Sequence, residues 1–188
     1  LGIMSMLWGG IGALRHVDAK LILAWGTVSQ LGLLVTLLAL GSGKSMFAAI
    51  SMLVAHALFK ATLFLIVGEI DVRTGTRDIS ELGGLFKTMP FATGAAVLAG
   101  LSMAGAPPLL GFTTKEAAIE ATLGMEGVEK VIAVGAVGLG AVFTVAYTTR
   151  FLWCVFGPGP DTPVAERRLA MTLPASFLAL TGVAGFIA

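Results

Sequence analysis

Two ionisable residues, His56 and Lys60, lie inside the apolar stretch 46–70. That stretch exceeds the roughly 20 residues that a helix needs to cross a bilayer. Because the two residues are four apart, they share one face of the predicted helix, about one turn from each other. A cationic amine near the membrane centre costs at least about 3 kcal/mol on insertion scales. His56 and Lys60 are therefore candidate functional residues.

The chemistry that these residue types can perform is proton transfer. A lysine in a low-dielectric site can gain and lose a proton near neutral pH, because desolvation disfavours the charged form. A histidine titrates in that range already. His56, Lys60 and Lys115 are therefore the parts that a proton relay through a membrane needs. Glu116 and Glu120 are possible modulating carboxylates, since a nearby carboxylate raises the proton affinity of an amine.

Lys115 follows a break in the apolar pattern at 105–108. Two consecutive prolines end a helix there, because proline lacks an N–H and restricts the residue before it. The next run, 109–123, is short for a span, so it is either a short buried helix or one half of an interrupted helix. Ionisable residues on a broken helix are tolerated at membrane depth only where protein or a water-filled cavity surrounds them.

The composition identifies an integral membrane protein. Hydrophobic residues make up 56% of the 188 positions and charged residues 12%, with a mean hydropathy of +0.94, whereas soluble domains average about 25% charged residues. The net charge of +1 does not indicate nucleic-acid binding. The single cysteine, Cys154, excludes an internal disulfide and a cysteine-based metal cluster. Neither a metal site nor a catalytic residue is predicted.

The pattern predicts an all-α polytopic bundle of about seven transmembrane helices, one region of which is interrupted by proline. The expected runs are 1–14, 21–41, 46–70, 89–104, 109–123, 131–156 and 168–188. A short surface helix is expected at 76–82, because Ile79, Leu82 and Leu85 recur at helical spacing. Residues 1–188 would form a single transmembrane domain, and the abrupt apolar start suggests a piece of a longer protein.

Polar groups also occur inside the run 21–41, at Thr27, Ser29 and Gln30. Such side chains in a membrane helix usually bond to a neighbouring helix, so packing is favoured over transport for this patch.

If all seven runs cross the membrane, the turns at 15–20, 71–88 and 125–130 lie on one side. The excess of lysine and arginine then predicts that this side is cytoplasmic. The two sets of cations are Arg15, Lys20, Arg73, Arg77, Lys87 and Lys130 against Lys44, Arg167 and Arg168.

Three separate motifs resemble a known family. They are DAKLILAWGTVSQLG at 18–32, HALFKA at 56–61 and SMAGAPPLLGFTTKE at 102–116. In this order and spacing they resemble the antiporter-like subunits of Mrp-type multisubunit Na⁺/H⁺ antiporters, respiratory complex I and membrane-bound hydrogenases. GEID at 68–71 and TGTRD at 74–78 are most similar to the Mrp A subunit.

The resemblance implies a fold of about fourteen helices in two inverted repeats, each with an interrupted helix. This chain matches the second repeat and the helix after it, as the C-terminal half of a longer antiporter-like subunit. The resemblance places His56, Lys60 and Lys115 on a hydrated proton path along the membrane midplane. It implies no organic cofactor, because the redox groups of related complexes reside in other subunits.

We therefore expect a multi-pass cation/proton (Na⁺/H⁺) antiport subunit of the cell inner (plasma) membrane. Its expected partners are other membrane subunits, protons, Na⁺ and the lipid bilayer, and no nucleic acid. One alternative is a non-redox, proton-pumping subunit of an NADH:quinone oxidoreductase or hydrogenase complex. A second alternative is a scaffold subunit whose buried charges only fix the helix register. Sodium dependence separates the first two functions, and unchanged activity after Lys60→Ala would favour the scaffold.

Overall fold

The structure, a computed structural model, describes residues 1–160, 162–165 and 169–187. Within these ranges the regular elements are all α-helices, and the β pairing is one isolated bridge between Asp18 and Asp78. The all-helical fold expected from the sequence is confirmed. The helices are α1 (Gly2–Arg15), α2 (Ala19–Ala39), α3 (Gly43–Thr74), α4 (Leu85–Thr88), α5 (Pro90–Ala104), α6 (Leu110–Leu123), α7 (Gly127–Phe156) and α8 (Leu169–Ile187).

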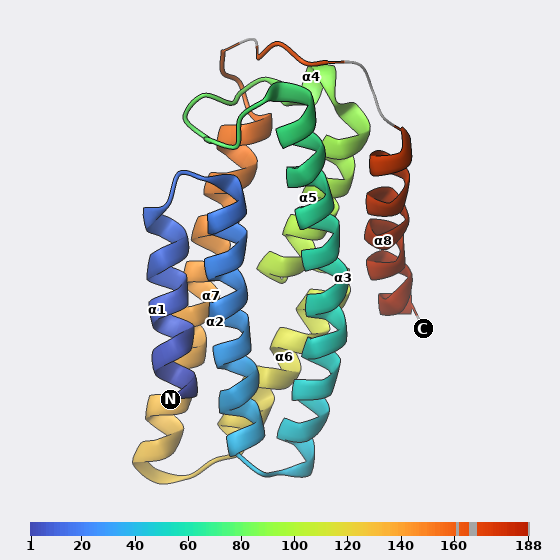
Figure 1. The fold of residues 1–188 in the computed structure, drawn as a ribbon. Coiled ribbons are helices and arrows are strands. Elements are labelled where there is room, and N and C mark those ends of the chain that lie inside the picture. Colours follow the sequence, from blue (N-terminus) through green and yellow to red (C-terminus); the bar gives the residue numbers. More distant parts are fainter. Residues whose placement is uncertain (161, 166–168, 188) are drawn as a thin grey trace.

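The long helices pack side by side in one bundle (Figure 1). Helices α1, α2 and α7 contact one another on one side of it, and α8 packs against α3 and α5 at the opposite edge. By length and composition, α2, α3 and α7 are candidate membrane spans in the part of the chain that the structure describes.

Helices α5 and α6 run in succession along α3 (Figure 1). Helix α5 has 15 residues, or a length of about 22 Å, which is less than the roughly 30 Å of a hydrocarbon core. Pro90 at its start lies beside Glu69 near the C-terminal end of α3. Glu120, near the end of α6, pairs with Lys44 at the N-terminal end of α3. The two helices together therefore extend along α3 as the two halves of an interrupted helix would, which was one of the two alternatives given for 109–123. The orientation argument, which counted 109–123 as a separate crossing, does not hold.

This arrangement also corrects the predicted sides of the turns. Met125 and Glu129 line the same cavity as Leu40, so the α6–α7 turn lies at the end of the bundle where α2 meets α3. The turns at 15–20 and 71–88 lie at the other end (Figure 1). Lys130 therefore belongs with Lys44 and not with the five cations of the first set. Arg167 and Arg168 lie outside the described residues.

The surface helix expected at 76–82 is also wrong. This segment forms turns whose backbone pairs with the loop before α2: Ile79 N donates to Val17 O at 2.9 Å, and Ala19 N donates to Arg77 O at 2.8 Å. The hydroxyl and backbone N–H of Ser80 both donate to the Asp78 carboxylate and lower its pKa. These local bonds replace those of a helix. Ile79 and Leu82 are buried, so the apolar spacing reflects loop anchors.

Helix ends follow from their capping residues. Asp18 accepts hydrogen bonds from Lys20 N and Leu21 N at the start of α2, at 2.7 and 3.1 Å. Ser42 and Ser45 cap each other reciprocally at the start of α3. Gly105, with φ of 86°, ends α5 in a left-handed conformation that glycine adopts without strain.

Close packing of α1 on α2 depends on glycine. A Cβ at Gly9 would overlap the backbone nitrogen of Ser29, and one at Gly32 would overlap that of Met6. Small residues of this kind let membrane helices approach closely. Ser29 Oγ donates to Met6 O at 2.7 Å across the same interface. The interhelical bonding that was expected of this polar patch is therefore confirmed for Ser29.

Candidate functional site

Lys60 is buried in the middle of α3, with 4% of its surface exposed. Its Nζ donates a hydrogen bond of 2.8 Å to Leu23 O on α2 and lies 5.9 Å from the ring centroid of Tyr147 on α7. Among the described residues, the ion pairs formed by lysine and arginine do not include Lys60. A backbone carbonyl therefore holds this ammonium group.

The space around the Lys60 ammonium exists because residue 26 is a glycine. A Cβ at Gly26 would lie 2.8 Å from Lys60 Nζ and 3.0 Å from Tyr147 Oη. Both polar atoms therefore border the same small volume beside α2. Any larger side chain at this position would displace one of them.

His56 lies one turn before Lys60 and is 7% exposed. Its ring packs edge-to-face on Phe59, with 5.4 Å between the ring centroids. The Nδ1 atom is buried and has no hydrogen-bond partner within the described chain. The structure thus keeps His56 beside Lys60 on one helix, as the spacing predicted.

Lys115 lies on α6, directly after the interruption. Its Nζ donates to Ala104 O at 3.0 Å, and Ala104 is the last residue of α5. The carbonyl groups at the C-terminal end of a helix carry partial negative charge, which favours a cation there. Gly105 also gives the side chain room, because a Cβ there would lie 2.8 Å from Lys115 Cδ. The break in the helix therefore forms the site that holds Lys115.

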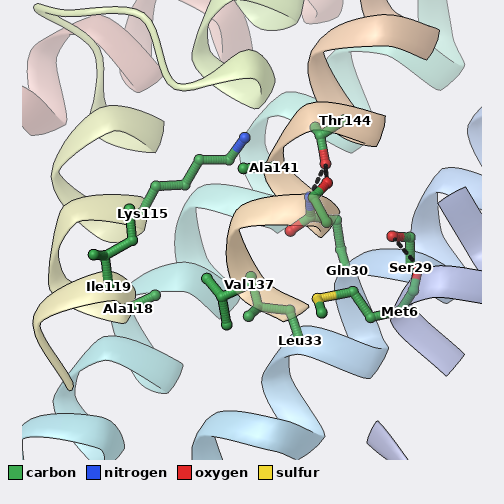
Figure 2. A pocket seen from close by; sticks show the side chains of 11 residues that line it. Met6, Ser29, Gln30, Leu33, Lys115, Ala118, Ile119, Val137, Ala141 and Thr144 are labelled. Carbon is green, nitrogen blue, oxygen red and sulfur yellow. Dashed lines mark hydrogen bonds between the residues drawn. The ribbon is translucent and has the colours of Figure 1, made fainter. Parts of the chain in front are cut away.

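A cavity of about 40 Å³ lies beside Lys115. Gln30 of α2 and Thr144 of α7 line it as well, and Gln30 Nε2 donates to Thr144 Oγ1 at 3.4 Å (Figure 2). Figure 2 shows the Lys115 side chain extending across the pocket towards Ala141 of α7. A volume of this size holds roughly three waters, at 10–15 Å³ of probe volume each. Met6, Leu33 and Val137 are among its apolar walls.

The two candidate carboxylates lie elsewhere. Glu116 and Glu120 are both exposed on α6. Glu120 Oε1 accepts from Lys44 Nζ at 2.7 Å, with the two side chains 65% and 74% exposed. The structure therefore brings His56 and Lys60 together and gives Lys115 a cavity of its own, but it does not bring either glutamate to Lys60.

Two buried polar groups were missed by the sequence reasoning. Glu69 and Arg73 form an ion pair of 3.2 Å, with side chains 1% and 8% exposed, and their i, i+4 spacing could have revealed it. Tyr147 is 1% exposed in the core beside Lys60. It is the only tyrosine in the chain, and its position inside an apolar run was a usable signal.

Residues 1–144 match the model of the family described as "NADH:quinone oxidoreductase/Mrp antiporter, TM". The chain belongs to this family. Subunit A1 of the Na(+)/H(+) antiporter is 36% identical over 177 residues in the JH9, Newman and JH1 strains of Staphylococcus aureus, covering 83% of this chain. The resemblance to antiporter-like subunits, and to the A subunit among them, is therefore confirmed.

A solved structure of the Mrp complex from Dietzia sp. DQ12-45-1b is similar over 99% of this chain, with a TM-score of 0.86 and 38% sequence identity. The chain spans about a fifth of these relatives: 22% of the Staphylococcus subunit and 21% of the Dietzia chain. The family match includes Gln30, His56, Lys60 and Lys115, whereas Tyr147 lies just beyond it. The chain is thus a membrane protein of the antiporter family, with Lys60 buried and Lys115 half-buried in the bundle.

Proposed function

We propose that this chain is part of a subunit that exchanges Na⁺ for H⁺ across the cell inner (plasma) membrane, in a complex with other membrane subunits. The relatives named above are an Na(+)/H(+) antiporter subunit and an Mrp complex. The observation that carries the proposal is Lys60, a buried amine whose hydrogen bond goes to a backbone carbonyl and not to a carboxylate.

A carbonyl partner suits a lysine that loads and releases protons. A carboxylate beside a deprotonated lysine would be left as an unpaired buried charge, which is costly. A carbonyl oxygen accepts a hydrogen bond from the ammonium and from the neutral amine alike. Lys60 and Lys115 both have such partners, Leu23 O and Ala104 O. Both lysines are therefore suited to act as proton-loading sites.

His56 would act as a relay next to Lys60. A neutral imidazole has one donor and one acceptor nitrogen, so it can take up a proton on one side and give one up on the other. The modulating role of Glu116 and Glu120 stays a prediction. The geometry supports it least, because both side chains are exposed and Glu120 is paired with Lys44.

Residues 1–188 would form one transmembrane domain with six passages: α1, α2, α3, α5 with α6, α7 and α8. This would be the second repeat of an antiporter-like module, with the helix after it, inside a longer subunit. One end of the bundle holds five cations, Arg15, Lys20, Arg73, Arg77 and Lys87, and the opposite end of the described chain holds two, Lys44 and Lys130. The end with the excess of lysine and arginine would face the cytoplasm.

A second candidate function is proton pumping in an NADH:quinone oxidoreductase, which the description of the matched family also names. The same buried residues would act, but electron transfer would drive them. Everted vesicles that carry the complete complex separate the two functions. Antiport predicts that adding Na⁺ dissipates an imposed pH gradient without any electron donor. Proton movement that ignores Na⁺ and requires NADH oxidation would overturn antiport in favour of pumping.

A further inference from the structure

Besides His56 Nδ1, two uncharged polar atoms near the lysines are buried without a hydrogen-bond partner in the described chain: Gln30 Oε1 and Tyr147 Oη. Gln30 is 3% exposed and Tyr147 is 1% exposed. Leaving a buried donor or acceptor unsatisfied costs about 1–3 kcal/mol. Buried polar atoms that lack a protein partner are therefore usually satisfied by ordered water. Each of these atoms is a candidate water site.

The two atoms occupy the interval between Lys60 and Lys115. Tyr147 Oη borders the space above Gly26 that also holds Lys60 Nζ. The same hydroxyl lies close to the side chains of Gln30 and Thr144. Gln30 and Thr144 in turn line the cavity that Lys115 borders (Figure 2). Polar groups thus follow one another from one lysine to the other along the boundary of α2 and α7.

We propose that Tyr147 and Gln30 hold ordered water between Lys60 and Lys115, and that protons pass between the lysines through these waters and the Tyr147 hydroxyl. A hydroxyl both donates and accepts, so it can hand a proton on without a net change in its own charge. The Gln30 amide has no transferable proton at neutral pH and acts as a positioning residue through its Oε1. This inference rests on the proposed function and adds residues of α2 and α7 to the proton path.

The route differs from one through His56. His56 is on α3, packs on Phe59 and is not among the residues that line the cavity beside Lys115. The proposed route follows two other helices. Gly26 and Gln30 lie one turn apart on α2, and Thr144 and Tyr147 lie one turn apart on α7. The packing interpretation of Gln30 accounts for its hydrogen bond to Thr144, but not for its buried Oε1.

The test compares Tyr147→Phe, Gln30→Leu and the double variant in the complete complex, beside wild type and Lys60→Ala. Tyr147→Phe removes one oxygen and keeps the ring, so packing is preserved. Thr62→Val is the matched control, because it removes a buried hydroxyl on α3 that bonds to Leu58 O outside the route. The readout is Na⁺-driven proton exchange in everted vesicles at equal levels of assembled complex.

We expect each single variant to lower the exchange rate by about tenfold or more, in line with the loss of a positioned proton-transfer group. The double variant should be no slower than the slower single variant, because both interrupt one route. Thr62→Val should exchange at the wild-type rate. Multiplying losses in the double variant would indicate independent packing defects and would overturn the proposal.

The outcome with Lys60→Ala separates this inference from the function on which it rests. If Lys60→Ala abolishes exchange while Tyr147→Phe and Gln30→Leu exchange at the wild-type rate, the water route is wrong and antiport stands. If Lys60→Ala exchanges normally, the proton-loading role of Lys60 is wrong, and the route between the two lysines is wrong with it. A cryo-EM map of the wild-type complex gives an independent measurement. Density for water within hydrogen-bonding distance of Tyr147 Oη is expected, and its absence where other buried waters are resolved would also overturn the route.

Discussion

The ammonium group of Lys115 lies 3.0 Å from the carbonyl oxygen of Ala104, the last residue of α5. A lysine on the second half of an interrupted helix is thus held by the end of the first half. The interruption leaves that carbonyl without an intrahelical partner, and the helix dipole makes it attractive to a cation. The break and the lysine therefore form one structural unit.

Replacing Lys115 with methionine should abolish Na⁺-dependent proton exchange while the complex still assembles. Methionine keeps much of the length of the side chain and removes the amine, so the loss would report the proton site. The matched control is Lys44→Met, because the Lys44 side chain is 74% exposed and pairs with Glu120 at the end of the bundle. Wild-type exchange in the Lys115 variant would remove this lysine from the path.

Glu120→Gln and Glu116→Gln should leave exchange close to the wild-type rate. Both side chains are exposed, and an exposed ion pair such as Lys44–Glu120 contributes only about 0–1 kcal/mol. Exchange rates in vesicles, measured across a range of pH, check this expectation. A marked fall in either variant would support the modulating role that the sequence suggested.

Arg73→Ala should lower the stability of the complex by about 1.5–3 kcal/mol, because it removes the charged group that bonds to the buried Glu69 carboxylate at 3.2 Å. Arg73 also donates from Nε to Ala165 O at 3.0 Å, so the connection before α8 loses a contact. Arg77→Ala is the control: its pairs with Asp18 and Asp71 are partly exposed, at 3.4 and 3.6 Å. Thermal unfolding of the purified complex measures the difference, and equal effects of the two variants would contradict it.

Gly9→Val should separate α1 from α2 and prevent correct assembly. Its Cβ would overlap the backbone of Ser29, which cannot move as a side chain can, and overpacking typically costs about 1–3 kcal/mol or more. Gly138→Ala on α7 is the control, since a Cβ there meets nothing within 4 Å. The yield of assembled complex after solubilisation is the readout. Normal yield of the Gly9 variant would show that the helices are less closely packed than described.

The sequence predicted the helices well and their arrangement less well. Apolar length and polar turns located each long helix, because these features are local. The single passage of α5 and α6 depends on where each helix ends relative to α3, as the Glu120–Lys44 and Pro90–Glu69 contacts show. No local pattern contains that information. The helix predicted at 76–82 was wrong for a similar reason, because the backbone partners of this segment, Val17 and Ala19, are distant in the sequence.

The candidate site residues likewise divide into those that a local pattern reveals and those that depend on the arrangement of the helices. Lys60 and Lys115 were predictable, since a lysine in an apolar run is unusual on its own. The neutral groups near them were not predicted, because the polar side chain of Gln30 has an ordinary packing role in a membrane helix and a single tyrosine in an apolar run does not reveal which lysine lies beside it. Their significance comes from Gly26, which places Tyr147 Oη beside Lys60 Nζ. That relationship joins three helices and is visible only in the fold.

The most direct test of Lys60 as a proton-loading site is Na⁺-dependent proton exchange in everted vesicles carrying the complete complex, with Lys60→Ala beside wild type. Lys44→Ala, made at the exposed lysine of the same helix, controls for the loss of a positive charge. Lys60→Ala is expected to abolish exchange at equal levels of assembled complex, and Lys44→Ala is expected to keep it. Exchange at the wild-type rate in Lys60→Ala would contradict the proton-loading role of Lys60 and leave His56 and Lys60 as structural residues.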